Sequence, residues 1–264
     1  MHGVDVSEEL RRDPDSYREL FAEGDLFLPI SEVWRDKLLE AGCPPEKTVV
    51  HHMGVDTERY RFQPRHHSEG APVNLLTVGR LVERKGLAAA LRAVAGLAAE
   101  GVDARFTIVG DGPLRPELEA LRDELGLQEQ VRFLGWKDQE NVVELMQRCD
   151  ILLAPSRTTE SGDQEGIPVT LMEAMASGMI VVSTWHSGIP ELVEDGVSGV
   201  LVPERDIETL TDVLLRIVLE EGEAWPLVGE AARDKVYREF DVNNLNAVLV
   251  GRFNAVLDRQ IFAA

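Results

Sequence analysis

Two glutamates, spaced so that they bracket the start of a helix, are the residues of this sequence best placed to do chemistry. Glu165 begins the run EGIPVTLME and Glu173 ends it. Pro168 suits the first turn of a helix, because the N–H group that it lacks would have no partner there. The free amides at such a helix start, with its partial positive charge, favour a phosphate group. Carboxylates on both sides can accept hydrogen bonds from sugar hydroxyls, and the run therefore predicts a nucleotide-sugar pocket.

The alternative is that both glutamates are ordinary surface charges, which is the commoner meaning of an isolated pair at this spacing. Glu173, however, interrupts the apolar run of residues 169–176, where a charge facing the core would be costly without a partner. A strand-like segment, residues 151–156, precedes the pair. These two features favour a buried glutamate with a function.

The elements that must position this run alternate between strands and helices. Strands are predicted at residues 73–78, 105–109, 131–134, 151–154, 179–183 and 199–202. Helices are predicted at residues 87–100, 114–125, 141–148, 206–221, 223–239 and 242–259, in addition to the helix of the EGIPVTLME run. This alternation is typical of a parallel sheet that is covered on both faces.

The first part of the chain is predicted to be less regular. Helices are expected at residues 13–21 and 32–41, and strands at residues 25–30 and 49–56. The segment 57–72 is polar, contains two prolines and shows no periodicity, so a domain boundary is predicted there.

Cations follow the first strand of the predicted sheet. Ligands of such sheets bind beyond the carboxyl ends of the strands, where Arg80, Arg84 and Lys85 are expected to lie. Arg80 and Lys85 could clamp a diphosphate and stabilise the charge that develops on it as it leaves. A surface ion pair with Glu83, ahead of a helix beginning at Gly86, is an equally good interpretation of this segment taken alone.

Glycines follow the next two strands. The run GDGP at residues 110–113 permits a close backbone approach or a positive φ, although it is also an ordinary turn. Gly135 and Trp136 could offer contacts to a nucleotide base, and Trp136 could equally be a packing residue. The segment 184–191 would border the same cleft. Each signal is weak alone, but all of them are expected at one edge of the sheet.

Composition excludes several classes of protein. The chain has 264 residues, 44% of them hydrophobic, which is sufficient for a sizeable core. Its formal net charge of -20 argues against nucleic acid or an anionic bilayer as the main partner, because both would be repelled. Cys43 and Cys149 lie far apart, so no disulfide framework or thiolate metal site is indicated. We predict no metal.

Hydropathy indicates where the protein resides. No apolar segment approaches the roughly 18 residues needed to span a bilayer, and the first residues show no apolar signal core. A soluble cytoplasmic protein is therefore expected.

Taken together, the motifs resemble the retaining glycosyltransferases of family four, which have the GT-B fold of two Rossmann-like domains. The matching segments are residues 79–80, 85–86, 110–113, 131–135, 155–156, 165–178, 188–191 and 196–202. Segments 2–5, 28–31 and 53–56 resemble the members associated with exopolysaccharide and colanic-acid-type synthesis. The resemblance implies an α/β fold of GT-B type and a hexosyltransferase that moves sugar from a UDP- or GDP-sugar to a glycan or lipid-linked acceptor with retention.

The resemblance also implies roles for the matching residues. Arg80 and Lys85 would hold the diphosphate, Glu165 would contact hydroxyls of the transferred sugar, and these three are the predicted catalytic residues. Glu173 would bind the ribose hydroxyls. The full set predicted to contact the donor is Gly79, Gly110, Gly112, Gly135, Trp136, Gly166, Ile167, Pro168, Val169 and Glu173. No cofactor and no metal is implied, because cationic side chains and a helix terminus take the part of a divalent ion.

The same comparison predicts the domain organisation. Residues 1–56 correspond to the last part of an N-terminal Rossmann-like acceptor domain, 57–72 to a linker, 73–240 to the donor-binding domain and 241–264 to a helix that crosses back. We therefore expect a shortened reading frame, an excised fragment or half of a split enzyme, for which a chain supplying the missing domain is a candidate partner. Exposed apolar surface is expected on residues 25–30 and on the final helix. The complete protein is expected in the cytoplasm or at the inner membrane face.

Two alternative functions remain open at this point. One is a non-catalytic subunit that binds a nucleotide sugar and docks onto a partner chain. The other is a GT-B epimerase or donor hydrolase, which would release an epimer or free monosaccharide without an acceptor.

Overall fold

A six-stranded parallel sheet forms the centre of the protein. The computed structural model describes residues 13, 16–68 and 70–263, with side chains up to residue 258. The strands are β1 (Val73–Val78), β2 (Ala104–Val109), β3 (Val131–Gly135), β4 (Ile151–Ala154), β5 (Ile180–Thr184) and β6 (Val200–Val202). Their order is β3-β2-β1-β4-β5-β6, and every neighbouring pair is parallel. This is the Rossmann strand order, and the predicted α/β fold with a parallel sheet is confirmed.

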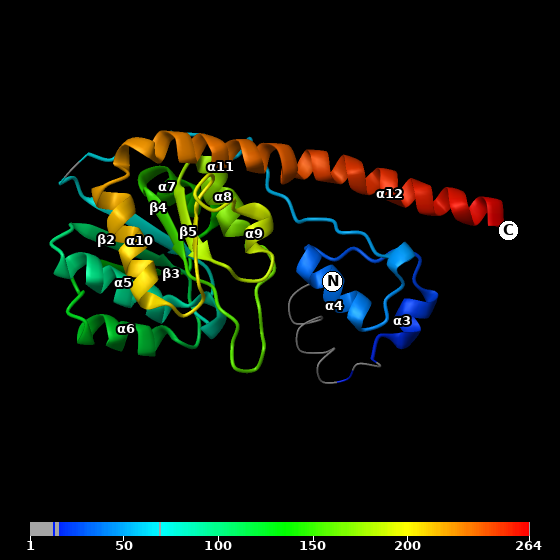
Figure 1. Ribbon diagram of the computed structural model, residues 1–264, viewed down its shortest axis with the longest axis horizontal. Coiled ribbons are helices and arrows are strands. Elements are labelled where there is room, and N and C mark those ends of the chain that lie inside the picture. The colour runs from blue at the N-terminus through cyan, green and yellow to red at the C-terminus, as the bar shows by residue number, and fades with distance from the viewer. Residues whose placement is uncertain (1–12, 14–15, 69, 264) are drawn as a thin grey trace.

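Helices cover both faces of the sheet (Figure 1). One face carries α5 (Leu87–Ala99), α6 (Arg115–Glu124) and α10 (Ile207–Leu219). The other carries α7 (Gln139–Arg148), α8 (Val169–Ser177), α9 (Ile189–Leu192) and α11 (Trp225–Glu239). Alternate residues of each strand enter the two cores, so that Leu75 packs with the first set of helices and Leu76 with the second. Burial on both faces explains why the strands read as continuous apolar runs.

The N-terminal part has a small core of its own. It contains α3 (Arg18–Glu23), α4 (Glu32–Glu40) and the short 3₁₀ helix η1 (Pro45–Lys47). Six buried side chains form this core: Phe21, Phe27, Ile30, Trp34, Leu38 and Cys43. The expected exposure of apolar surface over residues 25–30 is therefore wrong for Phe27 and Ile30, because both pack against Trp34 and its neighbours. The helix predicted at 13–21 lies partly, and the motif at residues 2–5 wholly, outside the described residues.

The two strands predicted in this part are wrong. Residues 25–30 and 49–56 make only isolated bridges, Phe27 with Thr48 and Val55 with Asp241. The N–H of Phe27 donates to Lys47, that of Val49 donates to Phe27 and that of His51 donates to Pro29, which is too short a pairing to form a ladder. Pro29, two residues after Phe27, accepts from His51 but has no N–H of its own to donate back, so the pairing ends there. Apolar composition alone made these segments look like strands.

The last helix, α12 (Val242–Ala263), continues the line of α11 and runs over the N-terminal part (Figure 1). Arg252 donates to the carbonyl of Val50 at 2.7 Å, which ties the helix to that part. Its apolar side chains Val248, Phe253 and Leu257 are exposed, as predicted. In the part of the chain that the structure describes, no helix combines the length and the apolar character needed to cross a membrane.

Two glycines bring the loops after β1 and β2 into contact. Gly110 has φ +126°, and a Cβ built on it would lie 1.9 Å from the carbonyl oxygen of Gly79. The N–H of Gly79 donates to Val109 at 3.0 Å, which holds the two loops together. A side chain at position 110 would force the backbone of both loops apart.

The substitution Gly110→Ala tests this contact. We expect it to lower the free energy of unfolding by about 3 kcal/mol or more, because an unfavourable φ is combined with a clash against backbone that cannot move aside. Gly101→Ala is the matched control: Gly101 has φ +78° but no described atom within 4 Å of its Cβ position. That variant should lose only about 1 kcal/mol in urea denaturation. Equal losses in the two variants would contradict the proposed contact.

Candidate functional site

A cleft of about 440 Å³ lies beyond the carboxyl ends of β1, β2 and β3, against α7 and α8. The sheet order reverses between β1 and β4, and open α/β sheets bind their ligands at such a reversal. Six residues predicted from the sequence line this cleft: Gly79, Arg80, Gly110, Trp136, Val169 and Glu173. Residues from four separate segments of the chain therefore meet at one place.

Arg80 and Lys137 are the two cations that line the cleft, and Arg80 is the one predicted from the sequence. Its side chain is exposed and has no hydrogen bond or ion pair within the described part of the chain. It lies at the carboxyl end of β1, while the first turn of α8 lines another side of the same cleft. The amides of Val169 and Thr170, in that first turn, have no partner inside the helix. A guanidinium and a helix start that share one cleft suit a phosphate group.

Glu165 is held by two cations rather than standing free. Arg84 donates from Nε to one carboxylate oxygen at 2.6 Å, and Lys85 donates to the other at 3.0 Å. Arg84 also pairs with Asp163 at 2.6 Å. The carbon chain of Lys85 lies beside Gly79, since a Cβ on that glycine would be 3.1 Å from Lys85 Cε. Lys85 thus joins Glu165 to the edge of the cleft.

Burial and charge oppose each other at this carboxylate. Burial by itself would raise the pKa of Glu165, but the charges of Lys85 and Arg84 and their hydrogen bonds hold that pKa below its ordinary value. Burial would lower the pKa of Arg84, but its hydrogen bond to Asp163, together with the charge of Glu165 and the hydrogen bond to it, raises that pKa instead. Glu165 is therefore ionised at neutral pH, although its side chain is only 10% exposed.

Glu173 is buried except where it faces the cleft. One carboxylate oxygen accepts hydrogen bonds from the hydroxyl of Tyr60 at 2.5 Å and from the amide of Gln139 at 2.8 Å. The other oxygen has no hydrogen bond within the described residues. Burial, followed by the hydrogen bond to Glu173, raises the pKa of Tyr60, so its hydroxyl stays protonated and donates. The second oxygen of Glu173 remains able to accept a ligand hydroxyl.

The other predicted donor contacts, like Lys85 and Glu165, are not among the residues that line the cleft. Gly112 approaches the backbone of Leu81, and Gly135 takes φ +68° at the end of β3. Ile167 is buried in the core, so only its backbone could meet a ligand, and Pro168 is the N-cap of α8. Gly166 faces away from the sheet: a Cβ there would lie 2.5 Å from Ile30 in the N-terminal part.

Several site residues were missed by the sequence interpretation. Arg84 was seen as part of a basic cluster but not as the closest partner of Glu165, and the suggested pairing with Glu83 is wrong because Glu83 binds Arg157 at 2.9 Å. Tyr60 was missed because the segment 57–72 was interpreted only as a polar boundary. Tyr60 and Phe62 are the two aromatic residues of that otherwise polar segment, and this was the signal that could have drawn attention to Tyr60.

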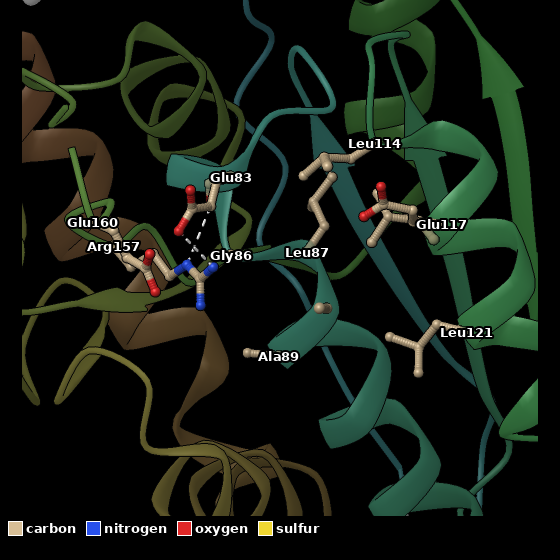
Figure 2. Close-up of a pocket in the computed structure, with 11 residues that line it drawn as sticks. Glu83, Gly86, Leu87, Ala89, Leu114, Glu117, Leu121, Arg157 and Glu160 are labelled. Carbon is tan, nitrogen blue, oxygen red and sulfur yellow. Dashed lines mark hydrogen bonds and ion pairs between the residues drawn. The ribbon is translucent and has the colours of Figure 1, made fainter. Parts of the chain in front are cut away.

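A larger cavity, of about 550 Å³, lies on the other side of Gly86, between α5, α6 and the loop after β4 (Figure 2). Its floor is apolar and consists of Leu87, Ala88, Ala89, Leu114, Leu118 and Leu121. Its rim carries the acids Glu83, Glu117 and Glu160, and its one lining cation, Arg157, is already paired with Glu83. A diphosphate would be repelled there, so the smaller cleft is the better candidate.

The chain carries the pattern of a known family and resembles named proteins. The family model described as "Glycosyl transferases group 1" matches residues 58–235. The chain is 41% identical over 257 residues to WcaL of Salmonella typhimurium strain LT2, provisionally named a colanic acid biosynthesis glycosyltransferase, covering 97% of this chain and 63% of that protein. It is 43% identical over 242 residues to the amylovoran biosynthesis glycosyltransferase AmsK of Erwinia amylovora, covering 91% and 59%. The chain thus spans about 60% of the length of these relatives.

Solved structures show the same fold. The crystal structure of Anabaena Alr3699/HepE in complex with UDP-glucose has a TM-score of 0.80 and 23% identity, and the match covers 96% of this chain and 71% of that one. A sucrose-phosphate synthase from Thermosynechococcus elongatus has a TM-score of 0.76 and 22% identity, covering 98% and 65%. At these identities the likeness concerns the fold alone.

The described residues contain no assembled set of metal ligands. No group of three or more histidine, cysteine, aspartate or glutamate side chains is arranged there to hold an ion. The absence of a metal from the reaction stays a prediction.

The variant Glu165→Gln tests the ion pairs of the site without a ligand. At pH 7 we expect the free energy of unfolding to fall by about 1–3 kcal/mol, because a neutral amide faces Arg84 and Lys85. The folded-state pKa of Glu165 lies below its ordinary value of 4.5, so this stabilisation is complete above about that pH and is lost as the pH falls through the folded value. The difference between the two proteins should therefore shrink in urea titrations at progressively lower pH.

Glu119→Gln provides the control for this measurement. Glu119 also accepts from an arginine, Arg115 at 2.8 Å, but its side chain is 38% exposed. Its loss should change stability by less than about 0.5 kcal/mol. A destabilisation by Glu165→Gln that is the same at all pH values would contradict the role of these ion pairs.

Proposed function

The chain belongs to the group 1 glycosyl transferase family, and from this premise we propose that it binds a nucleotide-diphosphate sugar and serves a hexosyltransferase reaction. The finer proposal is a retaining enzyme of family four with the GT-B fold, which acts in polysaccharide biosynthesis. The acceptor would be a glycan or a lipid-linked sugar.

The observation that carries the proposal is the single cleft shared by Arg80, the start of α8 and Glu173. A nucleotide sugar has a diphosphate in the middle, a ribose at one end of it and a hexose at the other. Arg80 and the amides of α8 suit the diphosphate, because both favour a dianionic group. Glu173 suits the ribose, because its unbonded oxygen can accept from the paired ribose hydroxyls.

The positions of Trp136, Glu165 and Lys85 suggest the remaining contacts to the donor. Trp136 is 76% exposed at the end of β3, where its ring could stack on the base. Glu165 lies at the other end, in the loop between β4 and α8, and is joined to the cleft edge through Lys85. This order supports the proposal that Glu165 contacts hydroxyls of the hexose and that Lys85 contacts the diphosphate.

The reaction that these groups would support is a substitution at the anomeric carbon. The bond from that carbon to the diphosphate oxygen breaks, a bond to the acceptor oxygen forms, and the acceptor proton passes to the departing diphosphate. With retention, attack comes from the face that the diphosphate leaves. The protein's part is to position the reactants and to stabilise the growing negative charge through Arg80, Lys85 and the helix start. We propose that no metal or cofactor is needed for this step.

The relatives support the same class of substrate. Anabaena Alr3699/HepE is a fold neighbour that was crystallised with UDP-glucose, which favours a UDP-sugar donor here. AmsK is named for the synthesis of amylovoran, a polysaccharide product, which favours a glycan acceptor. A GDP-sugar is the competing donor and is included in the experiments below.

Calorimetric titration of the chain with UDP-glucose and with GDP-mannose tests donor binding. Wild type should show saturable binding of one of them, and Arg80→Ala should weaken it by about 10- to 100-fold because a charged partner of the diphosphate is lost. Arg105→Ala is the matched control, since Arg105 is exposed and pairs with Asp103. Saturable binding that is unchanged in Arg80→Ala would overturn the assignment of the cleft.

Glu173→Gln tests the ribose contact separately. We expect about a 5- to 20-fold weaker affinity for the matching nucleoside diphosphate, because an amide is a poorer acceptor than a carboxylate and disturbs Tyr60 and Gln139. The affinity for inorganic pyrophosphate should stay within about 2-fold, since that probe lacks a ribose. Glu144→Gln, on the exposed side of α7, should behave as wild type. Equal losses for both probes in Glu173→Gln would count against a ribose site.

A further inference from the structure

The loop that carries Glu165 is anchored by a histidine that the proposed reaction does not otherwise use. Residues 155–168 form no helix or strand between β4 and α8. The backbone N–H of Glu165 donates to Nε2 of His186 at 3.0 Å. His186 follows β5, and its side chain is fully buried. A buried ring from the neighbouring strand thus holds the backbone of a predicted catalytic residue.

The hydrogen bonds determine which nitrogen of His186 carries the proton. Nε2 accepts from an N–H group, so it must be unprotonated. Nδ1 lies 2.5 Å from a carboxylate oxygen of Glu204 and must therefore be the donor. Glu204 is itself fixed by the N–H of Thr158 at 2.8 Å and by the hydroxyl of Thr158 at 3.2 Å. The neutral ring is thereby held in one tautomer and one orientation.

Glu204 is suited to this role because a carboxylate can only accept. Burial would raise its pKa, but the hydrogen bonds from Thr158 and His186 hold that pKa below its ordinary value, so Glu204 is ionised at neutral pH. An ionised Glu204 requires Nδ1–H on His186, and this leaves Nε2 free to accept from Glu165. A neutral amide at position 204 could instead donate to Nδ1 and allow the proton to move to Nε2.

Glu165 is consequently held from two sides. Its carboxylate is drawn toward the loop after β1 by Arg84 and Lys85. Its backbone is held on the β5 side by His186. The strand order places β4 between β1 and β5, so these two anchors pull in different directions across the sheet. Without the second anchor, the loop could follow its carboxylate toward the cations and away from a sugar.

We propose that His186 and Glu204 are positioning residues, which hold the backbone of Glu165 so that its carboxylate meets the hydroxyls of the transferred sugar. The proposal rests on the proposed function and adds two residues to its sugar end. It predicts that the pair matters for the hexose and not for the nucleotide. A merely structural role would affect both ligands alike.

Two substitutions at His186 separate its two hydrogen bonds. Gln extends to about the position of Nε2 and can still accept from the N–H of Glu165. Asn reaches only to about the position of Nδ1, so it can donate to Glu204 but cannot reach Glu165. Calorimetry with UDP-glucose and UDP, or with GDP-mannose and GDP if wild type prefers these, gives the ratio of the two affinities for each variant.

We expect His186→Asn to lose about 5- to 10-fold in affinity for the nucleotide sugar while its affinity for the nucleoside diphosphate stays within about 2-fold. In His186→Gln, the ratio of nucleotide-sugar affinity to nucleoside-diphosphate affinity should be close to that of wild type. His67→Gln is the matched control, because His67 stacks on Trp225 at 4.8 Å, on a different surface of the sheet domain. It should leave the ratio unchanged.

Glu204→Gln carries the test if the Asn variant does not fold, because it keeps the buried ring and alters only the group that selects its tautomer. It should lower the same ratio by about 3- to 10-fold. An unchanged ratio in His186→Asn or Glu204→Gln, or an equal loss for both ligands, would overturn the positioning role. If wild type binds the nucleoside diphosphate but gains nothing from the sugar, the positioning role fails while the nucleotide site stands. If wild type binds neither, the proposed function fails first and the positioning role with it.

Discussion

The ion pairs between Glu165 and the two cations Arg84 and Lys85 connect parts of the fold that the sheet would otherwise separate. The strand order reverses between β1 and β4, so the chain leaves these neighbouring strands toward opposite faces and opens a crevice between the loops that follow them. The carboxylate, which is 10% exposed, spans that crevice at 2.6 and 3.0 Å. Removal of either side would leave a charge without its partner in a largely buried place, which is why the loop positions depend on one another.

Local charge, and not the charge of the whole chain, governs what the cleft can hold. A net charge of -20 would repel a diphosphate at long range, but salt screens exposed charges beyond about 8 Å. Inside the crevice, Arg80 faces the open space while Lys85 stands at its edge. The acids nearby have partners: two cations pair with Glu165, Arg115 pairs with Asp111 in the lining, and Tyr60 and Gln139 donate to one oxygen of Glu173. In the larger cavity behind Gly86 the acids outnumber the cations, and the lining Arg157 is already paired with Glu83.

The sheet and half of the site could be predicted from the sequence because both depend on local patterns. Strands buried on both faces are continuous apolar runs, and all six were predicted within one residue at each end. Glu173 was identified because it interrupts such a run. The strands predicted at 25–30 and 49–56 were wrong, because a strand needs a partner that composition does not supply. Tyr60, Gln139, His186 and Glu204 act through contacts between distant segments, which a single sequence does not reveal.

The N-terminal part packs closely against the loop that carries Glu165. Both oxygens of Glu191 accept from the N–H of Glu32 at the start of α4, at 2.9 and 3.0 Å, and one of them also lies 3.0 Å from His52. The loop between β4 and α8 also contacts this part, because Lys37 of α4 donates to the side-chain carbonyl of Gln164. A Cβ on Gly166 would lie 2.5 Å from Cδ1 of Ile30, so a side chain at this position would require Ile30 to move. The residue after Glu165 is therefore pressed between two parts of the protein. A movement of α4 relative to the sheet would therefore shift Gly166 and, with it, the neighbouring carboxylate of Glu165, which is proposed to contact the sugar.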